Sequence, residues 1–233
     1  MRNLTMLTLF MLGIAGVVQG STLIDFENPP AGLTPNNFIQ GSPVDPTAQL
    51  TNQFENLGAI FSTFGGAPYA ALINLTGQAP SGVNGVGAVN TLGDVDYTQD
   101  LDIFLVVPGT TTPAVTDMIS IQGDEIPIPG NVIFTAYDVN GNLIASGIQP
   151  DSAGGTYALS AAGIHEFRLH SQSGTVAYDN LSFDVPTSPS GSTSAPEPQS
   201  SGLMVAGIAA IAGARSRVLF ARKRSTSFSL SAL

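Results

Sequence analysis

The chain has 233 residues, with 17 acidic and 7 basic side chains, no cysteine and no tryptophan. This length suffices for one sizeable domain, and the lack of cysteine excludes disulfide bonds, thiolate metal sites and a cysteine nucleophile. Arg168 is the only basic residue between Ser21 and Ser200, a region that holds every acidic residue, so its charge repels phosphates and no nucleic-acid partner is expected.

The first 20 residues have the pattern of a signal peptide. Arg2 supplies a positive n-region, an apolar h-region runs from Leu7 to Val18, and Val18 and Gly20 stand at the spacing that signal peptidase recognises. We therefore expect residues 1–20 to be removed by cleavage before Ser21 during export.

Residues 21–184 have the pattern of one all-β domain. Short apolar or alternating runs are separated by Gly, Pro and Asn turn signals, and no amphipathic helical period persists for three turns. Many short strands with regular turns predict a single antiparallel β-sandwich, jelly-roll-like in form. The predicted strands are Leu23–Phe26, Ala59–Thr63, Ala70–Leu75, Asp102–Val107, Met118–Gln122, Val132–Asp138, Leu143–Gly147, Thr156–Leu159, Glu166–His170 and Thr175–Phe183.

The segment NVIFTAYDVNGNLIASG gives the clearest hairpin signal. Asn140-Gly141 lies between two β-rich arms, and this dipeptide supplies the positive φ angles of a tight type I′ turn. The sequence therefore predicts an antiparallel pair that closes at this turn.

Four aspartates in GDVDYTQDLD form the densest carboxylate group: Asp94, Asp96, Asp100 and Asp102. In extended chain Asp94 shares a face with Asp96, and Asp100 shares one with Asp102. Three interpretations are open: a solvated acidic loop before the strand DIFLVV, a calcium site, or the paired carboxylates of a glycosidase.

The two histidines, His165 and His170, both lie in IHEFRLH. Five residues apart in a strand, they would point to opposite faces, which is a poor arrangement for a shared metal. No GxSxG, HExxH or phosphate-binding glycine loop occurs. These observations favour a protein without catalytic residues.

Acidic residues also stand at the two ends of the domain. Asp25 and Glu27 share one side of the first predicted strand, and Asp179 lies in the last. This placement is similar to that in jelly-roll carbohydrate-binding modules, whose paired terminal strands hold a structural calcium ion; the resemblance implies Glu27, Asp179 and Asp25 as candidate calcium ligands. Adjacent carboxylates repel each other unless a cation is present or a pKa rises. The alternative is that these are turn residues with local hydrogen bonds.

Exposed aromatic rings would favour sugar binding, and Tyr69 and Tyr97 are the tyrosines most expected at the surface because each lies in a turn-rich or acidic segment. The other three tyrosines fall inside strand patterns. No ligand can be named from this signal.

Three segments follow the domain. Residues 185–201 form a Pro/Ser/Thr-rich linker, residues 202–214 are apolar, and a basic cluster completes the segment 202–224 before the tail 225–233. An apolar helix followed by positive charge is typical of a membrane anchor with a cytoplasmic end, although the uninterrupted run is shorter than the ~20 residues of a full span. The basic cluster comprises Arg215, Arg217, Arg222, Lys223 and Arg224.

The order Pro196-Glu197-Pro198, apolar helix, basic cluster resembles the PEP-CTERM sorting signal of exopolysaccharide-producing Gram-negative bacteria. Segments such as LIDFEN, LGAIFS, YDVNGNLI and VAYDNLSFD are similar to the extracellular domains that carry this signal. The resemblance implies processing by an exosortase, a membrane-anchored precursor, and a cell-surface or extracellular product.

These observations predict a non-catalytic surface or matrix protein associated with exopolysaccharide or biofilm. A calcium-stabilised carbohydrate-binding module is the first alternative. A polysaccharide-cleaving enzyme is the second, and it would lose activity on replacement of Asp94 or Asp100 by asparagine.

Overall fold

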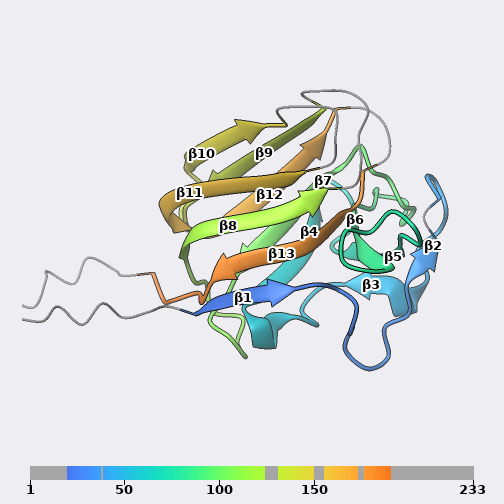
Figure 1. Ribbon diagram of the computed structural model, residues 1–233, viewed down its shortest axis with the longest axis horizontal. Helices are drawn as coiled ribbons and strands as arrows, with labels where there is room; N and C mark the ends of the chain where they lie inside the picture. The colour runs from blue at the N-terminus through green and yellow to red at the C-terminus, as the bar shows by residue number, and fades with distance from the viewer. Residues whose placement is uncertain (1–19, 38, 124–130, 150–154, 173–175, 190–233) are drawn as a thin grey trace, which may run out of the picture. The chain divides into compact units, whose positions relative to one another are not determined.

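The computed structural model describes residues 20–37, 39–123, 131–149, 155–172 and 176–189. Their regular structure is β-strand, apart from two short 3-10 helices, η1 (Pro46–Ala48) and η2 (Glu55–Leu57). The all-β prediction is confirmed for this part of the chain (Figure 1). The strands are β1 (Ser21–Ile24), β2 (Asn36–Asn37), β3 (Gln49–Leu50), β4 (Ala59–Phe64), β5 (Ala70–Asn74), β6 (Asn84–Gly87), β7 (Asp100–Leu105), β8 (Thr116–Gly123), β9 (Val132–Tyr137), β10 (Leu143–Ile148), β11 (Thr156–Ile164), β12 (Glu166–Ser171) and β13 (Tyr178–Asp184).

The described strands form two sheets. The first sheet has the order β11-β8-β13-β6-β5-β2, with β1 beside β13 and β3 beside β5, and the second has the order β10-β9-β12-β7-β4. All of the pairs between the longer strands are antiparallel, as predicted. The short β2 is an exception, because it runs parallel to β5.

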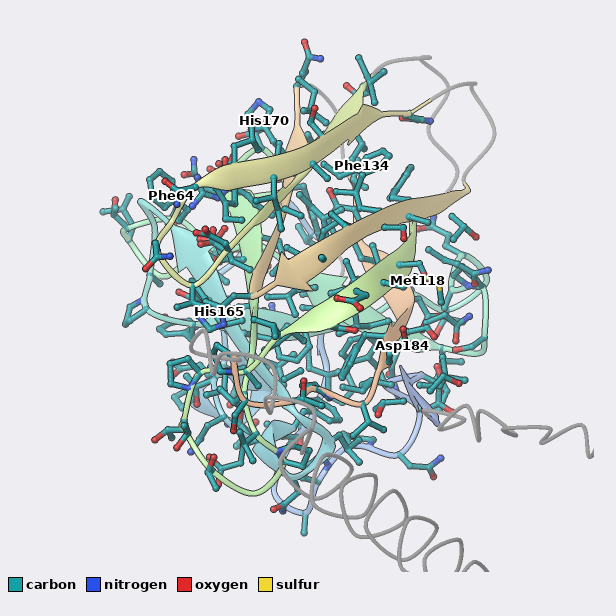
Figure 2. All side chains as sticks on the ribbon, turned by 90° about the vertical axis from the view of Figure 1, so that its left-hand side faces the viewer. Phe64, Met118, Phe134, His165, His170 and Asp184 are labelled. Atoms are coloured by element: carbon teal, nitrogen blue, oxygen red, sulfur yellow. The ribbon has the colours of Figure 1, made fainter. Side chains whose placement is uncertain are left out.

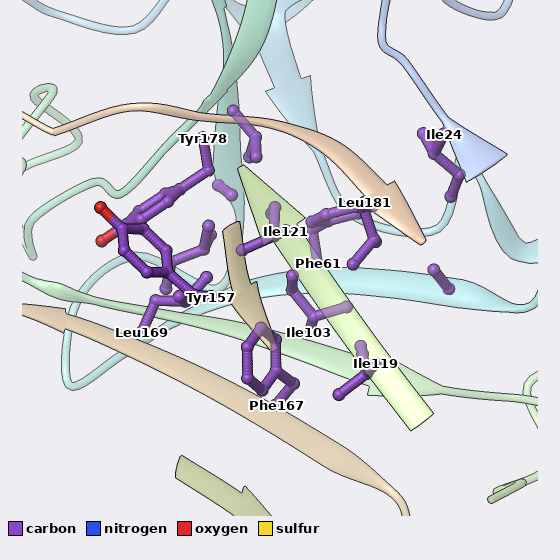
Figure 3. Close-up of a cluster of buried hydrophobic side chains, with 14 of the residues drawn as sticks. Ile24, Phe61, Ile103, Ile119, Ile121, Tyr157, Phe167, Leu169, Tyr178 and Leu181 are labelled. Atoms are coloured by element: carbon purple, nitrogen blue, oxygen red, sulfur yellow. The ribbon is translucent and has the colours of Figure 1, made fainter. Parts of the chain in front are cut away.

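The alternation seen in the sequence explains the second sheet. In β9 and β12 every second residue is buried, because successive side chains of a strand point to opposite faces. The buried side chains join those of the first sheet in one apolar cluster: Ile119 and Ile121 of β8 pack in the same cluster as Ile103 of β7 and Phe167 of β12. Figure 3 shows these four side chains together.

Strand β5 is buried on both faces. Ala70 and Leu72 belong to the main apolar cluster, whereas Ala71 and Ile73 belong to a second cluster that also contains Tyr97. A strand between two apolar clusters has no polar face, and its sequence AALIN accordingly shows no alternation.

Strand β6 was not predicted, because its sequence NGVG has the composition of a turn. Here the glycines serve close packing: a Cβ on Gly85 would lie 2.5 Å from the carbonyl oxygen of Tyr178, and one on Gly87 would lie 3.0 Å from the Tyr97 ring. Glycine inside a strand commonly marks such an approach of neighbouring groups.

The first and last strands of the described domain pair with each other. Ile24 of β1 lies opposite Leu181 of β13 in an antiparallel register. The first strand ends two residues before its predicted end, because Phe26 has a positive φ of 58°. Its ring is buried against Phe54 and Phe61, with centroid separations of 5.6 and 5.8 Å, and this packing stabilises the strained backbone.

The predicted β9–β10 hairpin is confirmed, but its turn type is not. Tyr137 lies opposite Leu143, and the Gly141 N–H donates to the Asp138 carbonyl at 3.0 Å. Gly141 has a φ of 78°, whereas Asn140 is not among the described residues with positive φ. A type I′ turn needs positive φ at both central residues; here Asp138 instead accepts the N–H groups of Asn140 and Asn142, which orders a longer loop.

The packed unit extends beyond the predicted domain end at residue 184. Pro186 is buried, and Thr187 exchanges two backbone hydrogen bonds with Val115, at 2.8 and 3.0 Å. The compact unit ends at Pro189. Among the described residues, no helix has the length and apolar character needed to cross a membrane; the signal peptide, the sorting motif and the anchor segment lie outside them.

Candidate functional site

Glu27 and Asp179, predicted as calcium ligands, converge on the segment 81–84. Glu27 Oε1 accepts the backbone N–H groups of Val83 and Asn84, each at 2.8 Å. Asp179 Oδ2 accepts the backbone N–H and the hydroxyl of Ser81, each at 2.8 Å. The two carboxylates, one shortly after β1 and one in β13, thus hold one segment of the chain, and we call this arrangement the carboxylate clamp.

Asp25 supports the clamp with its carbonyl oxygen and its carboxylate. The carbonyl oxygen lies 3.2 Å from Ser81 Oγ and shares that hydroxyl with Asp179, and Asp25 Oδ1 accepts the Glu27 N–H at 3.1 Å. The loop packs closely on Glu27, because a Cβ on Gly82 would lie 2.5 Å from the Glu27 Cδ. Burial raises the pKa of Asp179 and the charge of Glu27 adds to this rise, whereas hydrogen bonds from Ser81 and Asn180 oppose it.

Within the described residues, no group of three or more His, Asp or Glu side chains is arranged to hold a metal ion. Calcium at Asp25, Glu27 and Asp179 therefore stays a prediction, and the hydrogen bonds give an account of the clamp that needs no cation. Backbone N–H groups directed at a carboxylate favour its charged form.

A pair of Glu27 variants separates the two accounts. We expect Glu27→Ala to lower the free energy of unfolding by about 1–3 kcal/mol, because it leaves the buried Asn84 N–H without its acceptor. Glu27→Gln should lower the free energy of unfolding much less, because an amide oxygen still accepts both N–H groups. Urea unfolding with and without EDTA measures this; a calcium site would instead make both variants equally unstable and would make only the wild type sensitive to EDTA.

The aspartates of GDVDYTQDLD divide into two pairs with different surroundings. Asp96 lies in a loop and accepts hydrogen bonds from Gln40, Thr98 and Gln99. Burial acts to raise the pKa of Asp96, but these hydrogen bonds together outweigh it and lower the pKa. Asp100 and Asp102 belong to β7. Asp102, the first residue of the predicted strand, is 2% exposed, and the strand begins at Asp100, two residues earlier than predicted.

Asp100 and Asp102 share one face of the second sheet with residues from three other strands. Residues that lie opposite each other on paired strands point to the same side of the sheet. The rows of side chains across this face therefore follow from the strand register. We call it the outer sheet face, since the intervening residues Leu101, Ile103, Phe167 and Leu169 point into the core. Three rows of cross-strand neighbours form this face. They are Ile60–Phe104–Glu166–Tyr137, then Ser62–Asp102–Arg168–Thr135, and then the two pairs Phe64–Asp100 and His170–Ile133.

Arg168 lies at the centre of the outer sheet face. Its Nε donates to Asp102 Oδ1 at 2.8 Å and its Nη2 donates to Glu166 Oε1 at 2.6 Å. The guanidinium carbon also lies 4.0 Å from the centroid of the Phe64 ring and 4.9 Å from that of Tyr137. Two carboxylates and two rings therefore hold one cation in place, and a guanidinium suits both kinds of contact.

The electrostatics of this face depend on burial. Burial raises the pKa of Asp102 to about 7, although the adjacent Arg168 lowers it, and the charges of Glu166 and Asp100 raise it further. At the edge of the face, His170 Nδ1 lies 2.6 Å from Asp100 Oδ1. A perturbed carboxyl beside a fixed cation is frequent at functional sites.

The two histidines have different hydrogen-bond partners. His165 lies between β11 and β12, with its Nδ1 2.9 Å from the Ala114 carbonyl oxygen. His170 belongs to the outer sheet face. Figure 2 shows His170 and Phe64 on one side of the molecule, with Met118 and Asp184 of the first sheet on the other.

The prediction of exposed aromatic residues was wrong at Tyr97, which is 2% exposed in the second apolar cluster. Among the aromatic residues that the structure describes, Phe64 is exposed instead, at 55%, and half-buried Tyr137 lies on the same face. Phe64 was missed because only tyrosines were considered. Its position at the end of the alternating run AIFSTF, before Gly65-Gly66, gives the signal that could have identified it.

No family model and no curated protein matches the chain. Solved structures similar to it include the enzymatically active domain of tailspike protein 4 from bacteriophage CBA120, at 15% identity and a TM-score of 0.30, with 60% of this chain and 22% of that chain covered. Another is the M60 catalytic domain with the CBM51-1 and CBM51-2 domains of Clostridium perfringens ZmpB, at 11% identity and a TM-score of 0.29, with 72% and 15% covered. The chain spans less than a quarter of either structure's length, and likeness at this level assigns neither a fold nor an activity.

The outer sheet face offers two kinds of contact to a ligand. Phe64 and Tyr137 provide apolar ring surface. Around them, Arg168 provides donors and the carboxylates of Asp100 and Glu166 provide acceptors. Apolar surface with a few fixed polar groups is the usual composition of a ligand site.

Proposed function

We propose that the chain is an exported bacterial surface protein whose PEP-CTERM-like signal delivers a non-catalytic, polysaccharide-associated β-domain to the outside of the cell. The observation that carries the proposal is the order of Pro196-Glu197-Pro198, the apolar run and the cluster Arg215 to Arg224. The partners are an exosortase-type enzyme, the membrane before processing, and extracellular polysaccharide afterwards.

The architecture supports this proposal. A domain without cysteine must be stabilised by its own core, and here two sheets share one apolar cluster. The paired terminal strands β1 and β13 support a jelly-roll-like sandwich as the form of the domain. The compact unit ends at Pro189, seven residues before the Pro-Glu-Pro motif begins, so the motif lies outside the unit along the sequence.

Mass spectrometry of the C-terminus tests the proposal. In cells with a functional exosortase we expect the mature protein to begin at Ser21 and to end near Pro198. In cells without exosortase it should retain the apolar segment and remain in the membrane fraction. A chain that ends at Leu233 in both strains contradicts the sorting proposal, and polysaccharide cleavage that is lost in Asp100→Asn contradicts its non-catalytic part.

A further inference from the structure

We infer that the outer sheet face is the ligand site of the domain, and that its ligand is a neutral polysaccharide chain. The inference rests on the proposed function in one respect, because export would bring this face into contact with extracellular glycans. The binding chemistry itself follows from the residues of β4, β7, β9 and β12.

The first argument is the exposed surface of a fixed aromatic ring. The guanidinium of Arg168 lies 4.0 Å from the centroid of Phe64 and so covers one face of this ring, yet Phe64 remains 55% exposed. A large part of the side chain therefore stays open to solvent, although a cation packs on the ring. A ring held in one orientation loses little conformational entropy on binding, and the C–H face of a sugar ring is a suitable partner for its π-surface.

The second argument is the set of polar groups around the ring. Among the described residues, Asp100 and Glu166 each use one carboxylate oxygen in an ion pair, with His170 and Arg168 respectively. The second oxygen of each carboxylate can accept a hydrogen bond from a ligand hydroxyl. Arg168 has five N–H groups, of which two are used by the contacts to Asp102 and Glu166. Hydroxyl groups both donate and accept, so a polyhydroxylated ligand matches both kinds of group.

The third argument is charge, which selects among polysaccharides. Arg168 is the single basic residue among the acidic residues of the domain, and it already contacts Asp102 and Glu166. A uronate or sulfate chain would meet a surface of its own sign without a free cation, and this repulsion disfavours binding. A neutral chain has no such cost.

The contacts of Arg168 also connect the residues of the site to one another. Phe64, Asp102, Glu166 and Tyr137 come from four different strands, and each contacts the same guanidinium. The cation therefore fixes the positions of both rings relative to the carboxylates. We expect it to act as a positioning residue as well as a donor.

Isothermal titration of the full chain, purified in mild detergent, tests the inference. The probes are neutral oligosaccharides (cellohexaose, mannohexaose and galactohexaose) and polygalacturonate as the polyanion. We expect binding of at least one neutral probe and none of polygalacturonate, and we expect Phe64→Ala to weaken the affinity about tenfold or more. Phe64→Trp should restore binding, because it supplies a larger ring at the same position.

Met118→Ala is the matched control, since Met118 is an exposed apolar residue on the first sheet, at 46% exposure. It should bind like the wild type. Melting temperatures of the variants establish that each is folded. The inference fails if no neutral probe binds, if folded Phe64→Ala binds as tightly as Met118→Ala, or if only polygalacturonate binds. These results are independent of C-terminal processing. If the binding inference fails, the sorting proposal is still tested separately by mass spectrometry.

Discussion

Replacement of Arg168 by methionine is expected to lower the free energy of unfolding by about 3 kcal/mol at pH 8. The substitution keeps a long unbranched side chain but removes the guanidinium that contacts both rings and the charge that pairs with Asp102. Asp102 is 2% exposed, so its carboxylate would be left buried without a partner. Urea unfolding of the wild type and the variant measures the difference.

The stability that Arg168→Met loses should increase as the pH rises. The pKa of Asp102 is about 7 in the folded protein, against 3.8 as the ordinary value. The folded state therefore holds a proton that the unfolded state has released, and the contribution of Asp102 to stability falls as pH rises from about 4 to about 7. Without Arg168 the pKa rises further, so the variant should be least destabilised near pH 5, where Asp102 is protonated, and most destabilised at pH 8.

The control is the same substitution in an Asp102→Asn background. Asparagine has no charge to pair, so Arg168→Met should cost much less there, and the cost should not change between pH 5 and pH 8. A double-mutant cycle gives the coupling between the two residues. Equal losses in both backgrounds would show that Arg168 acts through packing on the rings and not through Asp102.

Local patterns in the sequence were sufficient for most of the strands. β9, β10 and β12 were predicted to within two residues at each end, because period-2 burial and the Asn-Gly signal depend on neighbours in the chain. β6 was missed for the opposite reason. Its Gly85 fits the approach of Tyr178, which is remote in sequence, and nothing in NGVG itself indicates a strand.

The candidate site, like the strands, was predicted where local spacing decides and missed where distant residues meet. Period-2 spacing correctly placed Asp100 beside Asp102, but their partner Arg168 lies 66 residues from Asp102 along the chain. Only the register of β7 with β12 brings them together, and register between distant strands is set by the whole core. The sequence carried two usable signals: the alternation Leu101, Ile103, Leu105 extends the strand back to Asp100, and a lone arginine in an acidic domain indicates an ion pair.

The second large effect is expected at the turn that follows Phe64. A Cβ on Gly66 would lie 2.1 Å from the carbonyl oxygen of Val89 and 2.9 Å from the Thr63 methyl carbon Cγ2. The oxygen belongs to backbone that cannot easily move, because the Val89 N–H donates to Thr63 Oγ1 and this hydroxyl donates to the Tyr69 carbonyl, each at 3.2 Å. Overpacking against fixed atoms costs about 1–3 kcal/mol in ordinary cases and more where nothing yields, so we expect Gly66→Ala to cost about 3 kcal/mol or more.

The adjacent Gly65→Ala is the matched control. It adds the same methyl group, but it destabilises the protein through backbone strain and not through overpacking. Gly65 has a φ of 68°, and no atom lies within 4 Å of the position that its added methyl group would take. Alanine there meets only the strain of the left-handed conformation, about 1–2 kcal/mol. Urea unfolding of the two variants should therefore rank Gly66→Ala well below Gly65→Ala in stability. The reverse order would mean that the backbone of Val89 yields readily to a methyl group, and it would contradict the prediction.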